Sequence, residues 1–334
     1  MLITSTILHF FVDGTCGAAL SLLALNGLET AEIVSAFLQY NLWAFGTQWV
    51  IGLVSDKWSL LSRKLLMLAM LMLAAGSCLN VDWQWLVVAL GLSNSIFHVV
   101  AGRLVLERYA GYKEPGIFVS SGALGLALGT QGIISLYIML AGVFVSAFFL
   151  YRMMDTDYEV KSYKVGANIG MCSSHQKSTL LIGMSIVALS ACVIIRGFSG
   201  TVQLAGMPLL LPCIYMLGKA LGGICCDKLG YKQMVLFLML TSFTTLQFVG
   251  LVPMLVFVLL CNMAMPLTLK MMHNYLPNQA GLAFGLAAGC LIPGWYFKEY
   301  MLSLPLLVML QFVLLFLGGY IGFTKLGAGV MHDE

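Results

Sequence analysis

Apolar segments of about 20 residues follow one another along almost the whole chain, and this arrangement limits the fold more than any other feature. Only 9% of the 334 residues are charged, whereas soluble domains are about a quarter charged. Because each segment matches the apolar core of a bilayer, the chain is expected to cross a membrane many times. Lipid offers no hydrogen bonds to the backbone, so the choices are helices or a closed barrel. Continuous apolar runs without alternation favour helices.

The apolar runs predict an all-α membrane protein with twelve helices joined by short links. The first run lacks a basic leader and a cleavage site, so it is expected to be a retained helix. The polar stretch 154–178 is interpreted as a cytoplasmic linker between an N-terminal six-helix bundle at 1–153 and a C-terminal one at 179–334. The expected helices span 2–25, 32–55, 63–80, 83–107, 114–130, 133–153, 179–203, 206–226, 232–250, 252–274, 280–297 and 302–324.

Basic residues are distributed unevenly between the two sides of this arrangement, and cytoplasmic links attract them. The chain has 17 Lys and Arg residues. With the even-numbered links and both termini inside, fourteen of them lie inside or at inner helix ends, and only Lys298 lies outside. Both termini are therefore predicted to be cytoplasmic, in the inner membrane of a bacterial cell. The fourteen are Lys57, Arg63, Lys64, Arg103, Arg108, Lys113, Arg152, Lys161, Lys164, Lys177, Lys228, Lys232, Lys270 and Lys325.

Charge also gathers in one stretch, IGLVSDKWSLLSRKLL at 51–66, and a related stretch, LGGICCDKLGYKQMVL, lies at 221–236. In each, a Gly precedes an Asp by four residues and a Lys follows the Asp directly. Asp227 follows Asp56 by 171 positions, and Lys270 follows Arg103 by 167. A repeat of about half the chain predicts two halves of like orientation, which is typical of a duplicated transporter fold.

The first stretch resembles the loop 2–3 signature of the major facilitator superfamily, G-x-L-a-D-r-x-G-r-k, and Gly223 to Lys232 resembles its second-half copy. With twelve helices and a central linker, the resemblance covers the whole chain. It implies alternating access of the two halves, with helices 1, 4, 7 and 10 lining a central cavity and helices 2, 5, 8 and 11 flanking it. Such carriers often work alone, so a monomer in the lipid bilayer is expected.

A narrower resemblance is to the fosmidomycin-resistance-type facilitators. It rests on NSIFHVVAGRLVLERYAGYKEPGIFVSSGALGLALG at 94–129 and on NMAMPLTLKMMHNYLPNQAGLAFGL at 262–286. This resemblance slightly favours export as the direction of transport.

Asp56 is expected at the cytoplasmic end of helix 2, where its carboxylate can pair with basic residues and with the N-terminal end of a neighbouring helix. Such a cluster can latch the two halves in one state and release them in the other. The alternative is a solvated loop that only follows the positive-inside rule. Arg103 and Glu107 are expected to form an intrahelical pair at the inner gate. The expected gating residues are Asp56, Arg63, Asp227, Lys232, Arg103, Glu107 and Lys270.

Charge inside a bilayer costs several kcal/mol, so charged residues within the predicted helices indicate function. Asp13 is expected midway along helix 1, either as a proton-coupling carboxylate or as a structural partner of Lys219 or Arg196. His9 lies one turn earlier on the same face, and either relays protons or only lines the cavity.

Arg196 and Lys219 outnumber Asp13, so the deep region is expected to be net positive and to suit a small anion such as a carboxylate, phosphonate or phosphate. Arg196 could instead extend to the outer interface. The expected substrate-binding residues are Arg196, Lys219, His98, Gln39 and Asn94. The Gly-rich helices 5 and 11 are expected to pack closely on their neighbours.

The leading hypothesis is therefore a proton-coupled secondary transporter, a symporter or antiporter, of a small organic anion. The alternative on the same fold is a divalent transition-metal transporter that uses His9, Asp13 and His98. A membrane enzyme or a sensor is disfavoured, because no catalytic, nucleotide-binding or metal-spaced motif occurs. No cofactor, resident metal or nucleic acid is expected. The nine cysteines contain no C-x-x-C pair and are expected to pack as small apolar residues.

Overall fold

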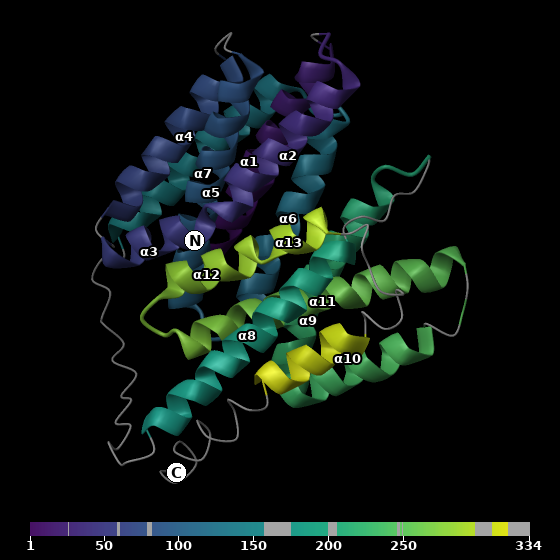
Figure 1. Ribbon diagram of the computed structural model, residues 1–334. Coiled ribbons are helices and arrows are strands. Elements are labelled where there is room, and N and C mark those ends of the chain that lie inside the picture. Colours follow the sequence, from purple (N-terminus) through teal and green to yellow (C-terminus); the bar gives the residue numbers. More distant parts are fainter. Residues whose placement is uncertain are drawn as a thin grey trace.

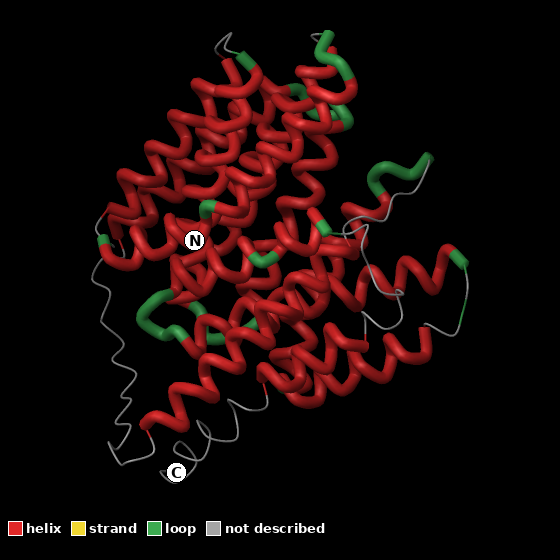
Figure 2. Tube along the Cα trace, viewed as in Figure 1, coloured by secondary structure: helices red, strands yellow, loops and turns green. Residues whose placement is uncertain are grey.

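The computed structural model describes residues 1–25, 27–58, 61–78, 82–156, 175–199, 206–245, 248, 250–297 and 309–319. Within these ranges the regular secondary structure is helical throughout (Figure 2). Among the described residues, six helices are long and apolar enough to cross a membrane, which agrees with an integral membrane protein. They cover Leu2–Leu23, Trp83–Arg108, Leu136–Met154, Thr179–Gly197, Leu210–Leu229 and Leu251–Tyr275. The full number of twelve stays a prediction.

The helices fall into two groups, which Figure 1 shows as two bundles. We refer to them as the N-terminal half (α1–α7) and the C-terminal half (α8–α13). The N-terminal half contains α1 (Leu2–Leu25), α2 (Thr30–Gly46), α3 (Gln48–Lys57), α4 (Ser62–Cys78), α5 (Trp83–Arg108), α6 (Lys113–Thr130) and α7 (Leu136–Thr156). The C-terminal half contains α8 (His175–Ser199), α9 (Leu210–Leu229), α10 (Tyr231–Thr245), α11 (Leu251–Tyr275), α12 (Ala280–Gly289) and α13 (Leu291–Tyr296). Across the two halves, α6 packs on α9 and α3 packs on α12.

Two predicted helices are interrupted, which corrects the sequence analysis. The helix expected at 32–55 divides into α2 and α3 at Thr47, whose hydroxyl bonds back to the carbonyl of Trp43 at 2.6 Å. Such back-bonding next to a glycine, here Gly46, bends helices. The helix expected at 280–297 divides into α12 and α13 at Cys290. Pro293 has no N–H to continue the helical ladder at that point.

Two other predictions fall largely outside the described residues. For the linker expected at 154–178, the structure describes the end of α7 at Thr156 and the start of α8 at His175. For the helix expected at 302–324, it describes the short apolar helix Met309–Gly319.

The glycines of α6 and α12 lie against neighbouring backbones, as the sequence analysis expected. A Cβ added at Gly125 would collide with the carbonyl oxygen of Phe10 on α1, and one at Gly285 with that of Gln48 on α3. The two helices pack on different partners. Gly125 of α6 packs on α1 in the same half, whereas Gly285 of α12 packs on α3 of the opposite half. These close contacts fix the positions of α1 and α3, which carry Asp13 and Asp56.

Candidate functional site

A cluster of polar side chains lies between α1 and α5 in the interior of the N-terminal half. His9 and Asp13 are one helical turn apart on α1, and His98 extends toward them from α5. The Nε2 atoms of the two histidines are 2.8 Å apart. The Asp13 carboxylate lies 3.2 Å from His9 Nε2 through Oδ2 and 3.7 Å from His98 Nε2 through Oδ1. We call these three residues the His–Asp cluster.

Backbone carbonyls orient both imidazole rings. His9 Nδ1 is 2.7 Å from the carbonyl oxygen of Phe118 on α6, and His98 Nδ1 is 2.9 Å from that of Asn94. A carbonyl oxygen only accepts, so each Nδ1 carries a proton and donates it. In the neutral rings both Nε2 lone pairs then point at each other across 2.8 Å. The contact is favourable only when a cation, such as a proton, lies between the two nitrogens.

Asn94 positions a second member of the cluster with its side chain. Its Nδ2 donates to Asp13 Oδ1 at 2.7 Å, while its backbone oxygen accepts from His98. Asn94 is only 1% exposed, and no described group bonds to its Oδ1. One residue of α5 therefore fixes both His98 and Asp13.

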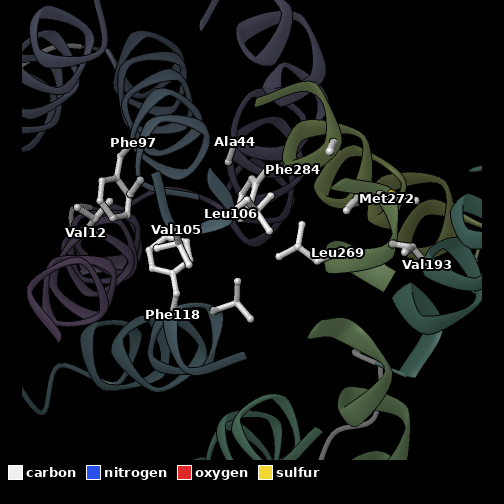
Figure 3. Close-up of a cluster of buried hydrophobic side chains, with 14 of the residues drawn as sticks. Val12, Ala44, Phe97, Val105, Leu106, Phe118, Val193, Leu269, Met272 and Phe284 are labelled. Atoms are coloured by element: carbon white, nitrogen blue, oxygen red, sulfur yellow. The ribbon is translucent and has the colours of Figure 1, made fainter. Parts of the chain in front are cut away.

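Aromatic rings enclose the two histidines. Phe118 and Phe97 lie near His9, with ring centroids 4.9 Å and 6.0 Å away. Phe284 of α12 approaches His98 from the C-terminal half, at 6.5 Å between centroids. Figure 3 shows the three rings of Phe97, Phe118 and Phe284. These apolar rings leave His9 and His98 only 3% and 6% exposed, and the low exposure strengthens the electrostatic interactions of the two imidazoles.

Gly122 of α6 closes another side of the cluster. A Cβ at this position would collide with Asp13 Oδ2 and His9 Nε2. Only a residue without a side chain allows α6 to approach the two polar groups so closely.

Arg196 on α8 and Lys219 on α9 bring positive charge from the C-terminal half. Arg196 is 5% exposed, so it is buried within the protein. Lys219 is close enough to Arg196, Asp13 and His98 to interact with each electrostatically. Within the described part of the chain, Asp13 forms ion pairs with the two histidines of the cluster. Whether Asp13 also pairs with Lys219 or Arg196 stays a prediction.

Asp56 and Asp227 each bind the N-terminus of a helix in the opposite half. Asp56 accepts bonds of 2.8 Å from the backbone N–H groups of Gly281 and Leu282, at the start of α12. Asp227 accepts bonds of 2.8 Å and 2.9 Å from those of Tyr112 and Lys113, at the start of α6. The contact with a helix N-terminus agrees with the expectation for Asp56, whereas the latch role stays a prediction.

The other expected gating residues show unequal arrangements in the two halves. Arg103 donates to Glu107 at 2.7 Å, the expected intrahelical pair, and also approaches Asp56 at 3.6 Å and binds the Ser55 carbonyl. Lys270, its counterpart, instead crosses to the N-terminal half and donates to the carbonyl of Tyr109 at 2.7 Å, just after α5. Lys270 therefore adds a contact between the two halves to those of Asp56 and Asp227.

Three expected site residues lie away from these contacts. The Gln39 amide donates to Ser35 on its own helix at 3.1 Å. Arg63 stacks over the ring of Tyr151 at 4.2 Å, and Lys232 is exposed at the start of α10. The substrate-binding role of Gln39 and the gating roles of Arg63 and Lys232 stay predictions.

Sequence reasoning missed the backbone groups that complete these sites. The N–H groups of Tyr112 and Lys113 precede those of Gly281 and Leu282 by 169 positions, which matches the repeat that relates Asp56 to Asp227. That offset is the signal that could have found them. The Phe118 carbonyl that orients His9 leaves no comparable trace, because any residue provides a carbonyl.

Comparison with solved structures identifies proteins that have a similar arrangement of helices. The chain aligns with a crystal structure of the major facilitator superfamily transporter FucP in its outward conformation, with a TM-score of 0.58 at 12% identity over 97% of each chain. The chain has the fold of a major facilitator superfamily transporter. A structure of the E. coli fucose:proton symporter FucP aligns with a TM-score of 0.57 at 10% identity over 97% of each chain.

A third solved structure with this fold is a bacterial homologue of the iron transporter ferroportin, in an outward-facing state. It aligns with a TM-score of 0.50 at 13% identity, over 97% of this chain and 99% of that chain. No model of a known protein family and no curated protein matches the sequence. The resemblance to the fosmidomycin-resistance branch therefore stays a prediction from the sequence.

Proposed function

We propose that this protein is a secondary active transporter that moves a small organic anion across the membrane by alternating access, coupled to protons. The observation that carries the proposal is the placement of Lys219, within the C-terminal half, in electrostatic range of the His–Asp cluster of the N-terminal half. The cation therefore lies in one bundle and the protonatable cluster in the other. Alternating access requires these two bundles to move relative to each other. The fucose:proton symporter among the structural neighbours supports proton coupling.

Arg196 and Lys219 support an anionic substrate. Two cations that interact in the membrane interior repel each other, and an anion held between them relieves this repulsion. Within the described part of the chain, Lys219 forms no ion pair with a carboxylate. A carboxylate, phosphonate or phosphate group can accept hydrogen bonds from both side chains.

Asp56 and Asp227 are proposed to latch the halves together at the end of the molecule where they lie. Each carboxylate binds a helix N-terminus across the interface, so release of the latch would separate the halves at that end. For the direction of transport, export is proposed from the sequence resemblance alone.

Flux measurements in proteoliposomes test the proposal. Anions that raise the melting temperature of the purified protein would first be selected from carboxylates, phosphonates and phosphates. Their flux should then follow an imposed pH gradient, and both Lys219→Met and Asp13→Asn should abolish the gradient-driven part. Lys64→Met, at an exposed lysine of α4, is the matched control and should transport normally. Gradient-driven anion flux that is unchanged in Lys219→Met would overturn the anion assignment.

A further inference from the structure

We propose that the His–Asp cluster is also a binding site for a divalent first-row transition-metal ion. The ligands would be His9 Nε2, His98 Nε2 and a carboxylate oxygen of Asp13. The inference goes beyond anion transport and does not depend on it, because these ligands lie in the N-terminal half and the proposed anion-binding cations lie in the C-terminal half.

The positions of the ligand atoms suit one ion. The three potential donor atoms all lie within 4.8 Å of one another. Metal–nitrogen bonds are about 2.1 Å long, so two adjacent ligands in an octahedral complex are about 3.0 Å apart. The two Nε2 atoms are 2.8 Å apart and their lone pairs converge, so a small rotation of the rings would admit the ion.

The surroundings of the ligands are those of a metal site. Ligating histidines almost always donate their second ring N–H to a carbonyl or a carboxylate, which fixes the tautomer and the orientation of the ring. His9 and His98 both do so here, through Phe118 and Asn94. Asn94 also donates to Asp13 Oδ1, which leaves Oδ2 directed toward His9 Nε2.

The donor set indicates which class of metal would bind. Two imidazoles and one carboxylate suit Mn²⁺, Fe²⁺, Co²⁺ and Ni²⁺, and such sets leave coordination positions open for water or a substrate oxygen. Asp13 offsets one of the two charges of the ion, and the nearby Lys219 adds repulsion. The ion is therefore expected to bind reversibly.

Binding of Co²⁺ to the purified full-length protein in detergent tests the inference, because its visible absorption reports the ligands directly. The wild type should bind one Co²⁺ per chain, and Mn²⁺ should compete. His9→Gln and His98→Gln should each weaken binding at least tenfold, as should Asp13→Asn. His273→Gln, which alters a histidine of α11 outside the cluster, should bind as the wild type does.

Lys219→Met separates this inference from the proposed function. It should strengthen Co²⁺ binding, because it removes a nearby positive charge, while it abolishes anion flux. Asn94→Ala removes an outer-shell partner but leaves the three ligands in place. It should weaken Co²⁺ binding roughly 10–100-fold, as loss of outer-shell partners does. A wild-type protein that shows no Co²⁺ spectrum at millimolar metal would overturn the inference. Equal affinity in the wild type and His98→Gln would overturn it too.

Discussion

Asp56 accepts a hydrogen bond from the backbone N–H of Gly281, and the two residues belong to opposite halves of the protein. The bond is 2.8 Å long, and the Asp56 side chain is only 8% exposed. A carboxylate at a helix N-terminus in such a partly buried position contributes up to about 2 kcal/mol. A contribution of this size can hold the halves together and still be released in each transport cycle.

Asp56→Asn should loosen this end of the molecule. The amide keeps the size of the side chain but removes the negative charge, so it can accept from only one of the two N–H groups. Hydrogen exchange at Gly281 and Leu282 should become several-fold faster. Glu107→Gln is the matched control, because it neutralises an exposed carboxylate beside the same Arg103 and should leave these amides protected. Unchanged exchange in Asp56→Asn would contradict the latch.

Gly52→Ala should prevent the same contact from forming. A Cβ at Gly52 would collide with the carbonyl of Gly281, so α3 and α12 could not approach as closely. We expect transport to fall at least tenfold while the protein still folds, because the substitution favours the state in which these helices are apart. Gly183→Ala, where the added Cβ meets nothing within 4 Å, should transport normally. Normal flux in Gly52→Ala would show that the close approach is dispensable.

Lys270→Met should also weaken the contact between the halves, from the side of α11. Lys270 is 4% exposed and donates to the carbonyl of Tyr109, so its loss leaves that carbonyl without this donor. The bond is part-buried, so the cost should lie at the low end of the about 1–3 kcal/mol that a buried acceptor loses with its partner. The melting temperature should fall in Lys270→Met and recover in Lys270→Arg, which retains a donor. An equal loss in both variants would indicate a packing role.

Much of the fold follows from the sequence, because apolar length and the repeated charges are local signals. Helix boundaries such as those of α1 and α5 lie within a residue or two of expectation. The two interruptions, at Thr47 and Cys290, were missed because each depends on one hydroxyl or one proline inside a continuous apolar run. Nothing in the hydropathy of either run marks the break.

The members of the His–Asp cluster can be singled out from the sequence, whereas their contacts cannot. Asp13, His98 and Lys219 could be singled out because charged and ionisable residues are rare in apolar helices. Their distances could not, because His9 and His98 are 89 positions apart and meet only through the packing of α1 on α5. The close approach of Gly122 also arises from packing, and a glycine within a Gly-rich helix gives no sign of it.

Gly122→Ala should therefore disrupt the His–Asp cluster without altering any of its members. The added methyl group would collide with Asp13 Oδ2 and His9 Nε2, so the side chains or α6 must shift. We expect proton-driven flux to fall at least tenfold and Co²⁺ binding to weaken, whereas an alanine in an unhindered helix is stabilising. Gly183→Ala on α8 provides that reference, because its added Cβ has open space. If Gly122→Ala keeps the flux and the Co²⁺ affinity of Gly183→Ala, neither transport nor metal binding depends on the exact positions of the side chains in the His–Asp cluster.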